Sequence, residues 1–359
     1  MLLSVQDLVV RFRTEDGTVH AVNGVSFDLD ASETLGIVGE SGCGKSATSL
    51  AITGLLPRGQ ANIPGGRILF DGVDLVDLPA PKMRELRGRE IAIVFQDPMT
   101  SLNPVLKIGS QLIEALSAHR KLHPREAAKR AAELLQTVGI PDPVKTMEYY
   151  PHQLSGGMRQ RVMIAMALAL APRLLIADEP TTALDVTIQA QVLELIRELT
   201  RRSGTAVILI THDLGIVASM TQRVAVMYAG FVVETAPTKE LFEGARHPYT
   251  IGLLHSLPRL DRDQPTELVP IEGTPPDQFQ LAPGCPFAPR CAWRLPICWT
   301  SNPPLVSVDE EEEALRTTGA RASHRFACHN PATTEEARVG HPLRAGFVPA
   351  AAPVQQSVP

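Results

Sequence analysis

The sequence predicts an α/β fold with a parallel sheet at its core. From Leu174 onward, three short apolar segments have the length and composition of strands: LLIAD, TAVILITHD and RVAVMYAGFVVE. A long helical segment, TIQAQVLELIRELTRR, separates the first of these from the second. Strands that alternate with helices in this way are typical of a parallel sheet covered by helices.

The remaining segments add further parts in chain order. The N-terminal segments VQDLVVRFR and HAVNGVSFDLD indicate strands and turns, and the buried strand TLGIVG follows them. From about Met99 the apolar residues recur at helical spacing, which predicts an inserted helical subdomain over about 99–170. Proline becomes frequent after Thr235. We therefore expect a first domain over 1–235, an accessory C-terminal domain over 236–330 and a disordered tail over 331–359.

Composition narrows the class of protein. The chain has 359 residues, of which 44% are apolar and 20% charged, as in ordinary globular proteins. A formal net charge of −5 argues against a nucleic-acid partner. The longest apolar run, Val162 to Pro172, is too short to span a bilayer, and the N-terminus does not resemble a signal peptide. We expect a cytoplasmic protein whose membrane role would go through a partner.

The segment GESGCGKS matches the pattern G-x-x-x-x-G-K-S between a buried strand and a helix. Glycines at these positions let backbone N–H groups surround phosphates, and the helix start adds a positive dipole end. Lys45 would reach the β- and γ-phosphates of a nucleotide, and the Ser46 hydroxyl would bind Mg²⁺. The predicted ATP-binding residues of this loop are Gly39, Glu40, Ser41, Gly42, Cys43, Gly44, Lys45, Ser46 and Ala47.

Two adjacent carboxylates end the strand in RLLIADEP. Asp178 stands where a phosphate-loop ATPase keeps the acid that holds Mg²⁺, directly or through water. Glu179 is then placed to act as the general base that polarises the attacking water. The two motifs together predict Mg²⁺-dependent ATP hydrolysis.

The segment QLSGGMRQR predicts a second helix whose N-terminus could bind a phosphate group. Ser155 is a favourable N-cap residue, and two glycines free the backbone before the helix. The chain thus has two such helix starts but one catalytic carboxylate pair. Two ATPase domains arranged head to tail, each closing the nucleotide site of the other, would use both.

Taken together, GESGCGKS, LSGGMRQR and LLIADEP resemble the ATP-binding cassette (ABC) family. The resemblance implies a phosphate-loop ATPase fold with an N-terminal antiparallel β subdomain. It also implies that Gln96 of VFQDP and His212 of ILITHD contact the γ-phosphate, that Gln96 helps to bind Mg²⁺, and that Asp185 of TTALD lies at a dimer interface. With Glu179, Gln96 and His212 are the expected catalytic residues. The signature that would contact the ATP of the partner subunit comprises Leu154, Ser155, Gly156, Gly157 and Met158.

The aromatic residue that stacks on adenine in this family is less clearly defined. Phe12 is the candidate, with His20 as the alternative.

Further segments resemble one subfamily, the ATPase subunits of bacterial dipeptide, oligopeptide and nickel importers: QDPMTSLNP, YYPHQLSGGMRQR, RHPYTIGLL and GTPP. That resemblance implies two membrane permeases, a second similar or identical ATPase subunit and an extracytoplasmic solute-binding protein. It places the chain on the cytoplasmic face of the bacterial inner membrane as a peripheral subunit. The alternatives are import of nickel or another non-peptide solute, a non-transport ABC ATPase, and a metal or redox sensor.

Four cysteines near the C-terminus are spaced Cys285-x5-Cys291-x6-Cys298-x29-Cys328. In a cytoplasmic protein such a set favours metal binding over disulfides, and four thiolates could hold Zn²⁺ or a [4Fe–4S] cluster. The spacing lacks the close pairs of structural zinc sites, and the family resemblance also favours the iron–sulfur cluster. Prolines between the cysteines predict an irregular loop.

The fifth cysteine, Cys43, occupies a free position of the phosphate-binding pattern. We interpret it as a small tolerated side chain without a redox role. Its position in the loop predicts that an alkylating reagent will block activity and that bound ATP will protect.

Overall fold

The computed structural model describes residues 1–97, 101–119, 122–182, 184–256, 271–308 and 324–332. The predicted tail over 331–359 therefore lies almost entirely outside the described residues. Within the described ranges, every helix falls short of the length and apolar character that a membrane crossing requires.

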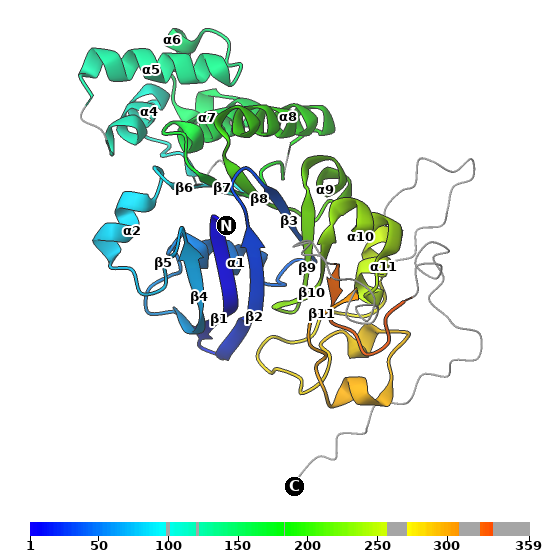
Figure 1. Ribbon diagram of the computed structural model, residues 1–359. Helices are drawn as coiled ribbons and strands as arrows, with labels where there is room; N and C mark the ends of the chain where they lie inside the picture. Colours follow the sequence, from blue (N-terminus) through cyan, green and yellow to red (C-terminus); the bar gives the residue numbers. More distant parts are fainter. Residues whose placement is uncertain (98–100, 120–121, 183, 257–270, 309–323, 333–359) are drawn as a thin grey trace, which may run out of the picture.

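A four-stranded antiparallel sheet occupies the N-terminal part, as the family resemblance implies (Figure 1). Its strand order is β2-β1-β4-β5. The bounds are β1 (Leu3–Thr14), β2 (Gly17–Leu29), β4 (Ala61–Phe70) and β5 (Val73–Asp74). Strands β1 and β2 form a long hairpin whose inward residues, such as Leu8 and Val22, are fully buried. This hairpin forms one wall of the main core.

The second sheet has eight strands in the order β11-β12-β10-β9-β3-β8-β7-β6. Its five strands from β9 to β6 are parallel, as the alternating pattern predicts, and β10, β12 and β11 extend it antiparallel. The bounds are β3 (Thr34–Val38), β6 (Ile91–Val94), β7 (Leu174–Asp178), β8 (Ala206–Ile210), β9 (Arg223–Tyr228), β10 (Phe231–Pro237), β11 (Val306–Ser307) and β12 (Arg325–Phe326). Strands β3, β7 and β8 are almost entirely buried, as expected for a sheet covered on both faces.

A helical layer lies over the β6–β7 end of this sheet (Figure 1). Among the described residues up to 235, the helices are α1 (Lys45–Ile52), α2 (Ala80–Leu86), α4 (Ile108–Ser117), α5 (Pro124–Thr137), α6 (Pro143–Thr146), α7 (Gly156–Leu168), α8 (Val186–Ser203) and α9 (Leu214–Met220), with the 3₁₀ turn η1 (Pro151–Gln153). Leu112 of α4, Leu135 of α5 and Ile164 of α7 share one buried cluster with Ile196 of α8. The described part of the predicted helical segment contains α4 to α7, which pack together, while its bounds of about 99–170 stay a prediction.

The C-terminal region is joined to the large sheet. The elements described there are α10 (Thr238–Gly244), α11 (Pro248–His255), η2 (Ala288–Arg290) and η3 (Pro296–Trp299), together with β11 and β12. Strand β12 pairs with β10, so residues after 300 extend the same sheet that carries β3. The predicted boundary at Thr235 falls inside β10 and stays a prediction.

The cysteine segment is less irregular than expected. Both η2 and η3 are short 3₁₀ helices that have proline in their first turn. Proline is tolerated there because the N–H that it lacks would have no intrahelical acceptor. The predicted irregular loop thus contains two short 3₁₀ turns, and within the described residues 284–299 no longer helix runs through the prolines.

Candidate active site

The phosphate-binding loop connects β3 to α1, as predicted. Gly39 and Gly44 have φ of 154° and 102°. A Cβ atom on Gly39 would lie 2.2 Å from the Met227 carbonyl oxygen, and one on Gly44 would lie 2.3 Å from the Ala21 carbonyl oxygen. Glycine is required at both positions because the loop passes so close to neighbouring backbone.

Lys45 is the first residue of α1 and is 5% exposed. Its Nζ atom donates to the carbonyl oxygens of Gly39 at 2.7 Å and Glu40 at 3.0 Å. Two backbone carbonyl groups of the same loop therefore fix the position of the Lys45 ammonium group.

A cavity of about 590 Å³ opens in front of this loop. Its lining combines the loop with residues from four other parts of the chain: Ala21, Ser41, Gly42, Gly44, Lys45, Ser46, Ala47, Gln96, Glu179 and His212. The structure therefore brings the predicted phosphate-binding and catalytic residues to one cavity of ordinary ligand size.

Asp178 is the last residue of β7, directly before the cavity-lining Glu179, and is 7% exposed. Its Oδ2 atom accepts from the Ser49 hydroxyl at 3.4 Å, whereas Oδ1 is buried without a hydrogen-bond partner among the described residues. Burial raises the pKa of this carboxyl group, and the Ser46 and Ser49 hydroxyls oppose that shift. A buried carboxylate oxygen without a partner fits a divalent cation, so this site suits Mg²⁺.

Glu179 adopts a left-handed backbone conformation with φ of 46°. Such a conformation costs about 1–3 kcal/mol for a non-glycine residue and is often found at functional sites. It turns the side chain toward three other residues. Oε2 accepts from Gln96 Nε2 and Thr182 Oγ1, each at 3.0 Å, and lies 3.5 Å from His212 Nδ1.

This arrangement can support general-base catalysis. The carboxylate of Glu179 is oriented by two donors, so it can accept a proton from a water molecule in the cavity. The exposed imidazole of His212 lies on the same side, where it could bind an anionic oxygen. The sequence analysis did not identify Thr182 and Ser49, which donate to Glu179 and Asp178. Thr182 could have been found, because it lies in the segment TTALD, three residues after the carboxylate that it contacts.

The second helix start lies apart from this cavity. Ser155 caps α7 through its hydroxyl, which accepts from the Met158 N–H at 3.3 Å. None of residues 154–158 lines the 590 Å³ cavity, and Ser155 is exposed. Asp185 is also exposed, at the N-cap of α8. Both features are therefore available to a second molecule.

The two adenine-stacking candidates lie on the β1–β2 hairpin. Phe12 is half-buried and packs against the main core, and His20 is also half-buried. Burial lowers the pKa of His20, with a further contribution from Arg11. Neither residue lines the cavity, and the assignment of Phe12 stays a prediction.

Cys43 is 4% exposed, and its Sγ atom lies 3.9 Å from Lys45 Nζ. Burial raises its pKa above that of an ordinary thiol, although Lys45 acts in the opposite direction. A buried thiol with a raised pKa reacts slowly with alkylating reagents. The structure thus argues against the expectation that such reagents readily block activity.

The four C-terminal cysteines are free thiols, as is Cys43. Burial raises the pKa of Cys285 to about 11 and of Cys291 to about 12, and it also raises the pKa of Cys328. Cys285, Cys291 and Cys298 belong to one buried cluster. However, the described residues contain no group of three or more His, Cys, Asp or Glu placed to hold a metal ion. The predicted metal site, whether for Zn²⁺ or for an iron–sulfur cluster, therefore gains no support from the described residues.

The fold and the cavity define a class of protein, the ATP-binding cassette ATPases. A family model described as "ABC transporter" matches residues 22–182, and one described as "Oligopeptide/dipeptide transporter, C-terminal region" matches residues 233–298. A solved dimeric cassette, MJ0796 bound to ADP and Pi, has a TM-score of 0.59 and 26% identity. That alignment covers 66% of this chain and 98% of the other.

Curated relatives are much more similar. The dipeptide transport ATP-binding protein DppD of Bacillus subtilis is 58% identical over 83% of this chain and 88% of its own length. OppD of the same organism, an oligopeptide transport ATP-binding protein, is 54% identical over 86% of each chain. OppD of Escherichia coli is 51% identical over 85% of this chain and 89% of its own. The chain belongs to this family of ABC transporter ATP-binding subunits and uses ATP and Mg²⁺.

Proposed function

We propose that this chain powers the uptake of dipeptides or oligopeptides through partner permeases. The observation that carries the proposal is the C-terminal match over 233–298, because that region is described for oligopeptide and dipeptide transporters. The names of the similar proteins from Bacillus subtilis and Escherichia coli agree with it. Import of nickel by the same type of assembly is the alternative.

We assign the site residues as follows. Lys45 binds the β- and γ-phosphates, while Ser46, Asp178 and Gln96 hold Mg²⁺, which neutralises phosphate charge during hydrolysis. Glu179 accepts a proton from the attacking water, and its orientation depends on Gln96 and Thr182.

His212 then contacts the γ-phosphate, where it can stabilise the negative charge that the equatorial oxygens carry in the transition state. The carboxylate of Glu179 lies next to the ring of His212, so the base and this contact act at the same end of the substrate.

A second ATPase subunit, identical or similar, would complete the site. Ser155 and the two glycines after it start α7 with a helix end that suits an anion, but they do not line the cavity of their own chain. We propose that they contact the ATP bound by the partner subunit in a head-to-tail dimer. Exposed Asp185 would lie at the same interface.

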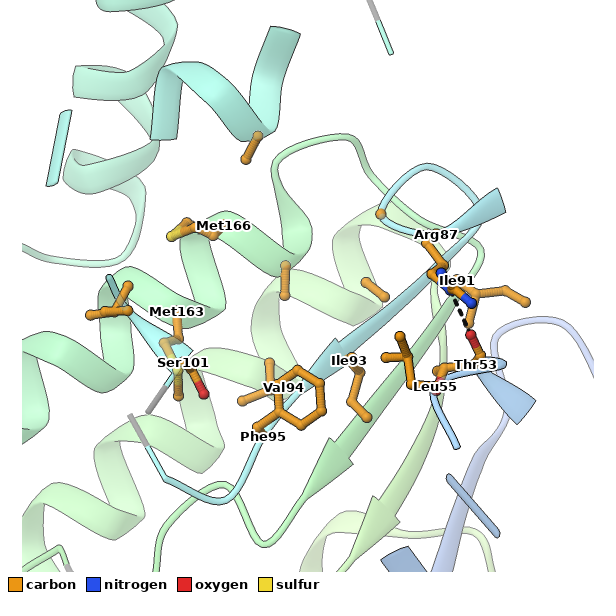
Figure 2. A pocket seen from close by; sticks show the side chains of 15 residues that line it. Thr53, Leu55, Arg87, Ile91, Ile93, Val94, Phe95, Ser101, Met163 and Met166 are labelled. Carbon is orange, nitrogen blue, oxygen red and sulfur yellow. Dashed lines mark hydrogen bonds between the residues drawn. The ribbon is translucent and has the colours of Figure 1, made fainter. Parts of the chain in front are cut away.

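The permease contact is expected beside Gln96. A cavity of about 260 Å³ lies between β6 and α7, lined mostly by apolar side chains that include Leu55, Phe95 and Met163 (Figure 2). Phe95 and Leu55 are each 37% exposed, and Phe95 is adjacent to Gln96. We propose that an apolar permease segment fills this cavity, so that movement of Gln96 on ATP binding reaches the membrane subunits. The chain would then lie peripherally on the cytoplasmic face of the membrane.

Copurification tests this function. When the tagged chain is expressed in its own cell and extracted in mild detergent, we expect it to bring down two multi-span permeases and a related ATPase. A solute-binding protein specific for peptides should stimulate ATP turnover of that assembly, and only when its peptide is present. Stimulation by a nickel-binding protein instead would establish the alternative, and recovery of soluble DNA-repair or translation factors alone would refute transport.

We further propose that the four C-terminal cysteines hold a [4Fe–4S] cluster. Backbone N–H groups donate to all four sulfurs: Leu295 to Cys298 at 3.4 Å, Asn330 to Cys328 at 3.3 Å, and others to Cys285 and Cys291. Such hydrogen bonds are typical of thiolate ligands. One zinc ion would need sulfurs about 3.8 Å apart, given Zn–S bonds of about 2.3 Å. A cluster binds each cysteine through a different iron and allows wider separation.

Anaerobic purification tests the cluster. We expect a brown protein that contains iron and acid-labile sulfide, and we expect Cys291→Ser to lose both. Cys43→Ser is the matched control, because Cys43 lies in the phosphate-binding loop, and it should keep the colour. A colourless chain with one zinc per molecule would contradict the proposal.

A further inference from the structure

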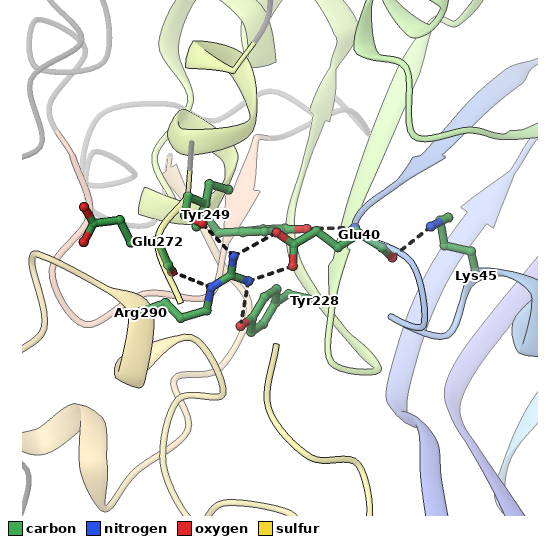
Figure 3. A network of polar contacts seen from close by, with 7 residues as sticks. Glu40, Lys45, Tyr228, Tyr249, Glu272 and Arg290 are labelled. Carbon is green, nitrogen blue, oxygen red and sulfur yellow. Dashed lines mark hydrogen bonds and ion pairs between the residues drawn. The ribbon is translucent and has the colours of Figure 1, made fainter. Parts of the chain in front are cut away.

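Arg290 is a buried arginine whose donors are all used. It ends η2 within the cysteine segment, and its side chain is 5% exposed. Nε donates to the Glu272 carbonyl at 2.9 Å, and Nη2 donates to the Ile271 carbonyl at 3.1 Å. Nη1 donates to the Tyr228 hydroxyl at 3.3 Å (Figure 3). The two remaining N–H bonds go to a carboxylate of the phosphate-binding loop.

That carboxylate belongs to Glu40, which occupies a free position of the loop pattern. Its two oxygens accept from Arg290 Nη1 at 2.7 Å and Nη2 at 3.0 Å, a bidentate pair across 250 residues of sequence. The backbone of Glu40 is held as well. Its N–H donates to the Tyr249 hydroxyl at 2.9 Å, and its carbonyl accepts from Lys45 Nζ at 3.0 Å. One residue therefore joins the C-terminal region to the lysine that would bind phosphate.

A second contact supports the same connection. The side-chain amide of Gln278 donates to the Gly42 carbonyl, and its backbone carbonyl accepts from the His20 N–H at 2.8 Å. The segment 271–290 thus meets the loop at Glu40 and at Gly42. Tyr228, Tyr249 and Phe287 pack their rings together behind Glu40, with centroids 4.6 to 5.4 Å apart, and this packing limits movement of the pair.

We propose that Arg290 is a positioning residue for ATP binding. Through Glu40, it holds the first turn of the phosphate-binding loop in the conformation from which Lys45 faces the cavity. The inference rests on the assignment of this loop to ATP. A bidentate Arg–carboxylate pair fixes geometry more strongly than a single hydrogen bond, because two parallel bonds define its orientation. The C-terminal region is then part of the nucleotide site as well as an accessory domain.

The test compares three substitutions in the full chain by equilibrium titration with ATP and Mg²⁺. Arg290→Met and Glu40→Gln should each raise the Kd for ATP about tenfold, since each removes a charge-assisted pair. Arg290→Lys should raise it less, because lysine keeps the charge but not the bidentate geometry. The double variant Arg290→Met with Glu40→Gln should bind no more weakly than Arg290→Met, as expected for residues that act as one unit.

Arg325→Gln is the matched control. Arg325 is an exposed residue of the same region, and it donates to the Leu305 carbonyl, away from the loop. The Kd of the Arg325→Gln variant for ATP should therefore be unchanged. A purely structural role for Arg290 would lower the unfolding temperature but leave the Kd of the folded protein unaltered. If Arg290→Met fails to fold, Glu40→Gln decides alone, since Glu40 is 27% exposed and its amide can be hydrated.

Two results would overturn the inference: a Kd within about twofold of the unsubstituted chain for both Arg290→Met and Glu40→Gln, or an equal loss in Arg325→Gln. The variant Lys45→Ala shows whether such a result refutes only the role of Arg290 or also the assignment of the loop to ATP. If Lys45→Ala loses affinity and the Arg290 variants do not, only the positioning role is refuted. If Lys45→Ala binds normally, ATP binds elsewhere and both are refuted.

Discussion

Glu179→Gln is expected to lower ATP turnover by about a hundredfold or more, since general-base catalysis contributes about 10²–10⁴-fold. Glutamine has the same shape and can still accept from Gln96 and Thr182, so the cavity should keep its geometry. It cannot accept the proton of the attacking water. We therefore expect ATP affinity to be retained and the dimer to accumulate in its closed form. Phosphate release measures the turnover, and size-exclusion chromatography with ATP and Mg²⁺ measures the dimer.

A glutamate outside the cavity provides the control for this variant. Glu194 lies on α8, where it pairs with Arg197 and is 59% exposed, so Glu194→Gln should keep normal turnover. Rapid turnover by Glu179→Gln would show that another group acts as the base. The proton would then have to go to the γ-phosphate itself or to His212.

Lys45→Ala is expected to weaken ATP binding by about a hundredfold, which corresponds to about 2.7 kcal/mol. The physical reason is that Nζ is the buried cation nearest the predicted phosphate position, held by the carbonyls of Gly39 and Glu40. Alanine removes that charge and leaves both carbonyls without this donor. Titration with ATP and Mg²⁺ measures the affinity, and the unfolding temperature without nucleotide checks that the chain is intact.

Lys239→Ala is a suitable control for the loss of a positive charge. Lys239 lies on α10 with 84% of its side chain exposed, near Glu243. Its removal should not change ATP affinity, because solvent screens such a charge from the cavity. Equal weakening in both variants would mean that net charge, and not the position of Lys45, governs binding.

The sequence was sufficient for the central sheet and for the phosphate-binding loop. Both depend on local patterns: strands and helices alternate along the chain, and Gly39, Gly44 and Lys45 lie within seven residues of one another. The family resemblance implied that Gln96 and His212 meet the nucleotide together with Asp178 and Glu179. They follow neighbouring parallel strands, whose carboxyl ends meet at one edge of the sheet.

Burial could not be predicted in the same way. Cys43 is a free position of the pattern, and only the packed structure shows that its thiol is covered and has a raised pKa. The positive φ of Glu179 likewise depends on its contacts, since no local preference of glutamate favours that conformation.

What the sequence by itself determined is the local chemistry: a loop for phosphate, a carboxylate pair for Mg²⁺ and water, and four thiols in one region. What only the tertiary structure decided is how distant segments meet. The pair between Arg290 and Glu40 joins residues 250 positions apart, and β12 adds to the sheet that carries the nucleotide loop. Such contacts leave no periodic pattern, because they arise from the way complete elements pack against one another.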